Sequence, residues 1–195
     1  MTITRRRILT TGAIAAGSLL TRDASLAQAP LDPTPACHDG DAATLRQTEG
    51  PFFKPSSPQR AELIEPGMGG QPIELTGFVL TRSCKPVPEA LLDLWQADSK
   101  GDYDNTGYRL RGHQFTDAQG RYRLDTIVPG LYPGRTRHIH VKVQAPDKPV
   151  LTTQLYFPGE GRNARDGIFH SALVMKMAAA KDRRAGVFNF VLDLA

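Results

Sequence analysis

The feature that most constrains the fold is the density of chain-breaking residues, with 18 glycines and 15 prolines among 195 residues. This composition favours short strands joined by turns over long helices. The turn at 117–120 predicts a hairpin between its two flanking strands, and Lys176–Arg184 is the only helix candidate. We therefore predict an all-β fold, a single-domain β-sandwich with an extended N-terminal arm and little helix. The expected strands are Ile73–Leu80, Leu91–Trp95, Gln114–Thr116, Tyr122–Leu124, His138–Val143, Thr152–Phe157 and a last one within Val187–Leu192.

Composition divides the chain into three parts. Residues 1–29 have the pattern of an export signal, residues 30–72 are rich in Pro and Gly and predict an extended arm, and residues 73–195 predict the sandwich core. A length of 195 residues suits one ordinary domain rather than two.

The N-terminus follows the order of regions found in secretory signals. Arginines at positions 5–7 precede a mild apolar stretch at 13–20, and small residues follow. The paired arginines resemble a twin-arginine signal, an ordinary Sec signal is the alternative, and cleavage fits after Ala27 or Ala29. We therefore expect a periplasmic or secreted protein. The stretch is too short to span a membrane, and we predict no membrane span.

The positive charge of the chain is concentrated in this signal-like segment. Residues 1–29 carry +3 of the total net charge of +4, so the remaining residues are close to neutral. A near-neutral body with few clusters of Lys and Arg argues against nucleic acid as a partner. The sequence does not indicate an oligomeric state.

Cys37 and Cys84 are the only two cysteines in the chain. In an exported protein two cysteines are more often paired than free, so we expect a disulfide, with two free thiols as the alternative. Two cysteines are too few for a four-cysteine zinc or iron–sulfur site.

The segment with the clearest chemical content is Tyr132–His140. Residues two apart on a strand point to the same face, so His138 and His140 project together while Ile139 faces the core. Two imidazoles on one face can bind a metal ion through two donors. Exposed strand histidines without a metal are the alternative.

The donors that could complete such a metal site are tyrosines. No Asp or Glu has a suitable spacing to the histidine pair, whereas Tyr103, Tyr108 and Tyr132 lie in segments that could approach it. Phenolate is a hard anionic donor that suits Fe(III) better than zinc. The residue types therefore favour a ferric site.

Six segments of the chain form an ordered set of motifs: Thr48–Phe53, Leu94–Ala97 with Gly101–Tyr103, Thr116–Tyr122, Pro129–Pro133, His138–His140 and Thr153–Phe157. Taken together they resemble the family of intradiol ring-cleavage dioxygenases, of the protocatechuate 3,4-dioxygenase type. The resemblance covers about residues 47–192 and implies a β-sandwich with a non-haem Fe(3+) ion.

The resemblance also implies roles for individual residues. Arg135 would stabilise negative charge on the ring and Gln154 would orient the substrate, while Gly50 and Pro51 would line the substrate pocket. One departure is a shortened segment in which only Pro133-Gly134 separates the second tyrosine from the arginine. That loss removes pocket walls, so the sequence does not indicate which catechol is the substrate. The implied iron ligands are Tyr103, Tyr132, His138 and His140.

The sequence thus predicts an exported Fe(III) dioxygenase. Its substrates would be a small aromatic diol and O2, and the ring would open between the two hydroxylated carbons to give a muconate-type product. One alternative is a non-catalytic prealbumin-like binding module of an extracellular protein. Another is a zinc hydrolase that uses the two histidines, although no carboxylate base is evident for it.

Overall fold

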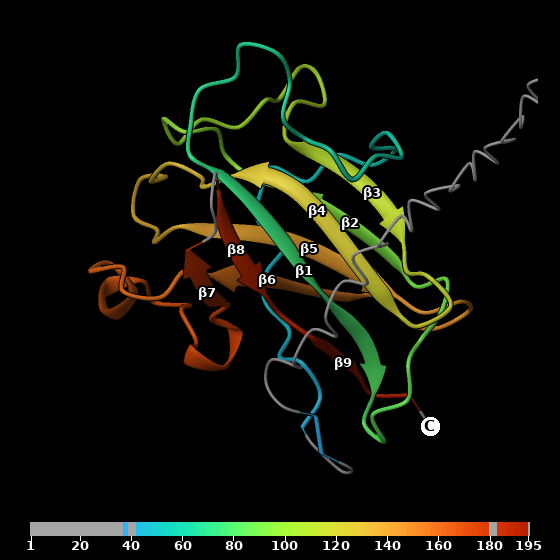
Figure 1. Cartoon of the computed structure of the whole chain (residues 1–195). Helices are drawn as coiled ribbons and strands as arrows, with labels where there is room; N and C mark the ends of the chain where they lie inside the picture. The colour runs from blue at the N-terminus through green and yellow to red at the C-terminus, as the bar shows by residue number, and fades with distance from the viewer. Residues whose placement is uncertain (1–36, 39–41, 180–182, 195) are drawn as a thin grey trace, which may run out of the picture. The chain divides into compact units, whose positions relative to one another are not determined.

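The computed structural model describes residues 37–38, 42–179 and 183–194, and the predicted export signal at 1–29 lies outside them. Within this part nearly all regular structure is strand (Figure 1). The helical elements described are two 3-10 helices of three residues each, η1 (Asn163–Arg165) and η2 (Ser171–Leu173). The strands are β1 (Pro72–Thr81), β2 (Leu91–Trp95), β3 (Arg111–Phe115), β4 (Arg121–Ile127), β5 (His138–Gln144), β6 (Leu151–Tyr156), β7 (Lys176–Ala179), β8 (Arg184–Val187) and β9 (Phe190–Leu192).

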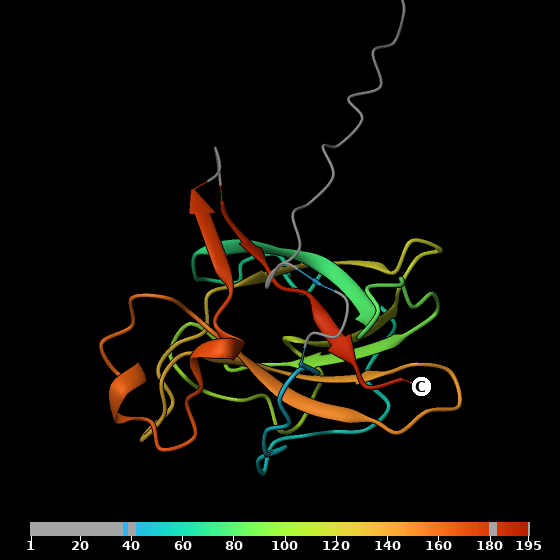
Figure 2. The ribbon, with the colours of Figure 1, turned by 90° about the horizontal axis from the view of Figure 1, so that it is seen from below.

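These strands form two sheets that lie in separate layers (Figure 2). One sheet has the order β4-β1-β8-β7, with β9 also paired to β1, and the other has the order β3-β2-β5-β6. The second sheet is antiparallel throughout, whereas β1 pairs in parallel with β8 and β9. The all-β prediction is therefore confirmed.

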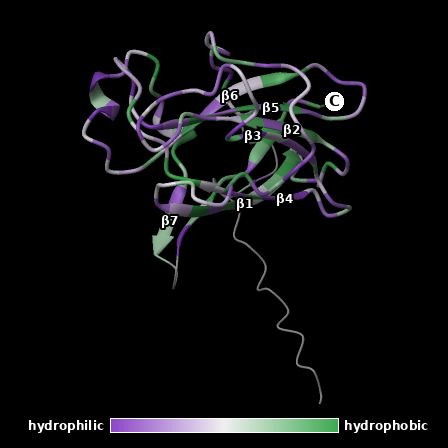
Figure 3. Cartoon of the chain, turned by 90° about the horizontal axis from the view of Figure 1, so that it is seen from above, coloured by the Kyte–Doolittle hydropathy of each residue, from purple (hydrophilic) through white to green (hydrophobic). Residues whose placement is uncertain are grey.

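The core lies between the two sheets, and on β1 it follows from an alternation of buried and partly exposed residues. Ile73, Leu75 and Val79 of β1 are buried and alternate with partly exposed residues. Ile139 and Val141 of β5 face them from the other sheet and are fully buried. Burying each such side chain contributes about 1.5–3 kcal/mol. Apolar residues accordingly concentrate along the strands in Figure 3.

Two local predictions are wrong. Residues 117–120 do form a turn, but β3 pairs with β2 and β4 pairs with β1, so the turn carries the chain from one sheet to the other instead of closing a hairpin. The helix candidate Lys176–Arg184 contains β7 and the first residue of β8, which pair with each other. In both cases pairing with distant strands outweighs the local sequence signal.

The segment before β1 runs as an extended arm along the second sheet. The amide of Gln47 donates to the Thr152 carbonyl on β6, and further along the amide of Arg60 donates to the His113 carbonyl on β3. Because β6 and β3 are the two edge strands of this sheet, the arm crosses the outer face between them. Residues 47–60 therefore cover that face, and the arm's backbone pairs with both edges.

Candidate metal centre

The outer face of the second sheet carries the predicted histidines. His138 and His140 alternate with the buried Ile139 on β5, so both rings project away from the sandwich core. His140 is directly opposite Trp95 on β2 and Gln154 on β6. The arm covers this face, and His138 and His140 are only 4% and 3% exposed. Both imidazoles are thus held in a dry environment.

Three donor atoms meet at one point on this face. The Nε2 atoms of His138 and His140 lie 3.1 Å apart, and the hydroxyl oxygen of Tyr103 lies 3.2 Å from the first and 3.1 Å from the second. Ligands bound at about 2.1 Å to one metal ion at roughly right angles lie about 3 Å from each other. The triangle formed by Tyr103, His138 and His140 therefore has the dimensions of one face of a coordination sphere.

Burial keeps both imidazoles in the neutral form that binds a metal, and a hydrogen bond sets the tautomer of His138. The carbonyl of Thr136 lies 2.7 Å from Nδ1 of His138, so Nδ1 carries the proton and Nε2 keeps its lone pair. The ring of His140 is stacked on Trp95 with centroids 4.8 Å apart. Burial lowers the pKa of His138 to about 4 and lowers the pKa of His140 well below its ordinary value. Both rings are therefore neutral at physiological pH.

Tyr103 needs nearby positive charge in order to ionise. Burial raises the pKa of its hydroxyl above the ordinary value, although Arg135 and Arg111 act in the opposite direction. Its ring is stacked on Phe52 of the arm, with centroids 4.3 Å apart. A bound cation would supply the charge that a buried phenolate requires. The site thus suits a metal ion of high charge.

Tyr132 lies beside Tyr103, and the two rings pack edge to face with their centroids 5.8 Å apart. No hydrogen bond joins its hydroxyl to either histidine within the described chain. The loops that carry the two tyrosines touch through glycines, because a Cβ on Gly130 would lie 2.3 Å from the Gly101 nitrogen and one on Gly101 would lie 2.4 Å from the Leu131 carbonyl oxygen. Only glycines allow this approach.

Tyr108, the other candidate from the same loop as Tyr103, points elsewhere. Its hydroxyl donates to the Pro55 carbonyl at 3.0 Å, and the Lys54 ammonium lies over its ring. Its oxygen is thus held by the arm. The geometry brings Tyr103, rather than Tyr108, to the histidines.

Arg135 and Gln154 meet next to the histidines. Nη2 of Arg135 donates to Oε1 of Gln154 at 2.7 Å, and Nε2 of Gln154 donates to the Thr48 carbonyl at 2.9 Å. Arg137 points away, because its guanidinium bonds the Pro129 carbonyl and pairs with Glu160. The geometry therefore supports Arg135 as the arginine of the site.

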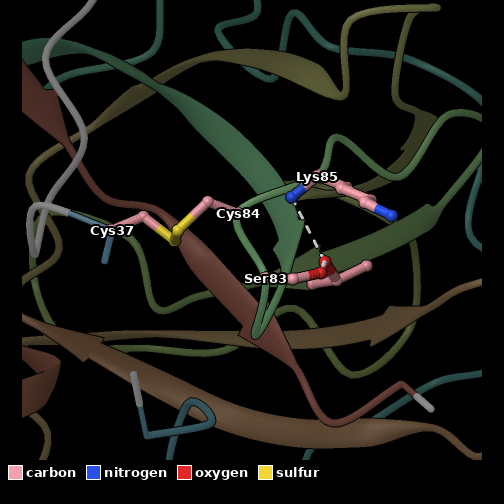
Figure 4. The surroundings of a disulfide bond; sticks show 5 residues. Cys37, Ser83, Cys84 and Lys85 are labelled. Carbon is pink, nitrogen blue, oxygen red and sulfur yellow. Dashed lines mark hydrogen bonds between the residues drawn. A yellow bond between two sulfur atoms is a disulfide. The ribbon is translucent and has the colours of Figure 1, made fainter. Parts of the chain in front are cut away.

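Of the two predicted pocket residues, Gly50 is the one that lies against a histidine of the site. Gly50 has a φ of +71°, and a Cβ there would lie 3.4 Å from Cε1 of His140. Pro51 follows in an exposed turn. Cys37 and Cys84 form a disulfide with their Cα atoms 5.8 Å apart, which ties the N-terminal part of the arm to the β1–β2 connection (Figure 4).

Sequence reasoning missed three residues near the site. Asp166, from the loop after β6, pairs with Arg135. The hydroxyl of Tyr156 lies 3.1 Å from Gln47 Oε1 and 3.3 Å from Gln154 Oε1. Arg111 is 1% exposed and donates to the carbonyls of Asp104 and Phe52. None has a local sequence signal, although the position of Tyr156 two residues after Gln154 on one strand face could have indicated their contact.

A cavity of about 470 Å³ lies between arm residues 46–48 and loop residues 167–170. None of the four candidate ligands lines it. It borders the site through Gln47 and Ile168, which both contact the Tyr156 hydroxyl. We assign it no part in the metal site.

Across the described ranges, no three residues of the types His, Cys, Asp and Glu cluster so as to hold a metal. A metal at the histidine pair would therefore need tyrosine as a further protein donor. The same part of the chain contains no helix of the length and apolarity that crossing a membrane would require.

Comparisons with known proteins identify the family of the chain. A protein-family model described as "Dioxygenase" matches residues 48–194. The chain belongs to the intradiol dioxygenase family. Among curated members it is 36% identical over 138 residues to the protocatechuate 3,4-dioxygenase beta chain of Burkholderia cepacia, covering 62% of this chain and 57% of that one. It is 30% identical over 154 residues to hydroxyquinol 1,2-dioxygenase of Nocardioides simplex, covering 67% and 52%.

Solved structures of intradiol dioxygenases have the same fold. The dioxygenase domain of a dioxygenase–carbohydrate-binding protein fusion from Streptomyces sp. SirexAA-E is 58% identical, with a TM-score of 0.77 over 79% of this chain and all of that one. The 3-chlorocatechol 1,2-dioxygenase of Rhodococcus opacus 1CP is 25% identical, with a TM-score of 0.72 over 78% and 73%. The present chain spans just over half the length of the curated relatives above. The comparisons favour a dioxygenase over a prealbumin-like binding module.

Proposed function

We propose that this protein is a non-haem Fe(III) dioxygenase that opens a catechol-type ring between its two hydroxylated carbons. The observation that carries the proposal is the triangle of Tyr103 oxygen, His138 Nε2 and His140 Nε2, with sides of 3.1–3.2 Å. Tyr132, beside Tyr103, would be the fourth protein ligand. The intradiol dioxygenase family uses non-haem iron.

The residues present fit a ferric ion. Two neutral imidazoles and two phenolates form a hard, anionic donor set that suits a trivalent metal. When bound, Fe(III) would supply the Lewis acidity and the electron-accepting capacity that let a catecholate react with O2. The proposed reaction balances without an external reductant: catechol and O2 give a muconate-type diacid, in which both oxygen atoms are retained and the bond between the hydroxylated carbons is broken.

Arg135 would act on the charge of the substrate. Its guanidinium lies next to the histidine pair, and its positive charge favours the anionic form of nearby Tyr103. The same charge would stabilise negative charge that develops on the ring during oxidation. Gln154 would keep this guanidinium in place, because its carbonyl oxygen accepts from Nη2 while its amide is held by Thr48.

Tyr132 would be the ligand that substrate displaces. A catechol must lose two protons to bind as a dianion: the oxygen of a departing Tyr132 phenolate can accept one of them, and a hydroxide can accept the other to form water. Nothing holds the Tyr132 hydroxyl to the histidines among the described residues. Tyr132 is followed by the exposed Pro133 and Gly134, and Gly134 has open space around it. Tyr132 could therefore swing slightly within its edge-to-face contacts with Phe52 and Tyr103, whereas Tyr103 is restrained by its parallel stack on Phe52.

The arm would form one wall of the substrate site. Gly50 lies against the His140 ring, and a side chain there would narrow the space above it. Pro51 follows directly and would continue the same wall. We propose that 30–72 act as this arm, and that the sandwich core begins at about residue 73.

We also propose that the protein works outside the cytoplasm, exported through the twin-arginine-like segment at 1–29. The disulfide between Cys37 and Cys84 supports an oxidising compartment. A twin-arginine route would carry the domain already folded.

The proposed activity is tested by incubating the iron-loaded protein with catechol, hydroxyquinol, protocatechuate and 3-chlorocatechol. We expect at least one of them to consume one O2 per ring and to give a muconate-type diacid that contains both oxygen atoms of labelled O2. Metal-free protein serves as the control. Cleavage beside the diol, or no O2 consumption with any of the four, would refute the proposal.

A further inference from the structure

Asp166 is a buried carboxylate to which the proposed chemistry assigns no role. Its side chain is 2% exposed and lies in the loop between β6 and β7. Oδ2 accepts from Nε of Arg135 at 2.9 Å and from the amide of Thr136 at 2.9 Å, and Oδ1 accepts from the amide of Ile168 at 3.1 Å. Burial alone would raise the pKa of Asp166, but these hydrogen bonds outweigh it and lower the pKa. The group is therefore a carboxylate at neutral pH.

Asp166 and Gln154 together fix the plane of the Arg135 guanidinium. Asp166 holds Nε and Gln154 holds Nη2, so two of the three nitrogens are bonded. Nη1 makes no hydrogen bond with any residue that the structure describes. The Arg135 side chain is 21% exposed, so Nη1 is the nitrogen left to meet a ligand.

The turn before Arg135 holds its backbone, because the Arg135 amide donates to the Tyr132 carbonyl at 3.1 Å, but it does not hold the Arg135 side chain. Only Pro133 and Gly134 separate it from Tyr132, and both are exposed. Gly134 has a φ of +75° and no atom within 4 Å of the position of a Cβ. A flexible arginine in such a short, open turn would sample many rotamers.

We propose that Asp166 is the positioning residue that directs Nη1 of Arg135 toward the substrate site. This inference rests on the proposed dioxygenase function. The loop between β6 and β7 thus supplies, from 31 residues away in sequence, the support that the shortened Tyr132–Arg135 segment lacks. A reacting group displaced by about 1 Å can cost on the order of 100-fold in rate, so precise support of this arginine matters.

The primary test is Asp166→Asn in the iron-loaded protein. An amide has one acceptor oxygen in place of two, so it cannot accept from Arg135, Thr136 and Ile168 in the same way. We expect kcat to fall roughly 10- to 100-fold, while iron content, the visible spectrum and KM stay close to those of the parent. An unchanged kcat would overturn the inference.

A double-mutant cycle separates positioning from other effects. If Asp166 acts through Arg135, Asp166→Asn should lower kcat no further in an Arg135→Ala background. Multiplicative losses would show that Asp166 acts by another route and would overturn the inference. Absence of ring cleavage in the parent protein would instead refute the proposed function.

The matched control is Asn163→Ala in the same loop. Asn163 accepts from the Thr136 hydroxyl and donates to the Phe157 carbonyl but does not touch Arg135. We expect a lower melting temperature with kcat retained. An equal loss of kcat in this variant would mean that loop stability, rather than support of Arg135, is what matters, and would overturn the inference.

If Asp166→Asn does not fold, the Arg135→Lys variant tests instead whether the held guanidinium is required. Lysine keeps the charge, but its single ammonium cannot bridge Asp166 and Gln154 as the planar guanidinium does. We expect a kcat close to that of Arg135→Ala. Recovery to within about threefold of the parent would show that charge alone suffices, and would overturn the inference.

Discussion

The Nε2 atoms of His138 and His140 lie 3.1 Å apart on the outer face of β5. Two donors bound to one metal ion at about 2.1 Å and roughly right angles would lie at about this separation, so the pair has the spacing of two metal ligands. His138→Ala and His140→Ala should each lose most bound iron while keeping the β-rich circular dichroism of the parent. Metal analysis after gel filtration measures this, and stoichiometric iron in either variant would contradict the assignment.

Gly130 and Gly101 are in direct backbone contact, which brings together the loops that carry Tyr132 and Tyr103. In Gly130→Ala the new Cβ would lie 2.3 Å from the Gly101 nitrogen, so one loop must move. We expect weakened iron binding and a loss of stability of about 1–3 kcal/mol by urea denaturation. Gly161→Ala, where no atom lies within 4 Å of the new Cβ, is the control. Equal iron binding and equal stability of the two variants would contradict a tight contact between the two loops.

The disulfide between Cys37 and Cys84 closes a long loop, with a sequence separation of 47. Its loss should cost at most about 4 kcal/mol, because the unlinked chain has more conformational freedom when unfolded. Exported protein should show no alkylatable thiol before reduction, and the Cys37→Ser, Cys84→Ser double variant should melt lower. Two reactive thiols in native exported material would contradict the bond.

The metal-free protein should become less stable as the pH falls. Burial lowers the pKa of His138 to about 4 from an ordinary value of 6.5, so the unfolded chain binds a proton at this position between these values while the folded chain does not. Stability is therefore fully present above pH 6.5 and decreases toward pH 4, by up to about 3 kcal/mol for this group. His138→Gln should reduce the dependence of the free energy of unfolding on pH. A free energy of unfolding that stays constant between pH 6.5 and pH 4 in the parent would contradict this prediction.

Much of the site could be predicted because its residues lie on regular strands or in motifs. The alternation of His138, Ile139 and His140 on a strand determines which side chains face outward. The arm's path over the same face could not be predicted, since residues 47–60 have no periodicity and are positioned by hydrogen bonds to β6 and β3. The hairpin at 117–120 was predicted wrongly for a similar reason. The sequence of a turn does not indicate whether the next strand joins the same sheet or the other one.

The roles of Asp166 and Arg111 could not be predicted from the sequence for a different reason. Each acts through partners distant in sequence, and a single Asp in a loop or Arg on an edge strand reads as an ordinary surface residue. Only the fold shows that both are buried and bonded to segments of the site. Long-range hydrogen bonds of this kind leave no local pattern.

Binding of Fe(III) by tyrosine and histidine side chains on the outer face of β5 can be measured by the visible absorption spectrum together with iron quantification. We expect a coloured protein with about one iron per chain and a phenolate-to-iron charge-transfer band. Tyr103→Phe should alter the band strongly, Tyr132→Phe should keep iron and some colour, and Tyr108→Phe, the control, should match the parent. A colourless protein that holds stoichiometric zinc would contradict the account.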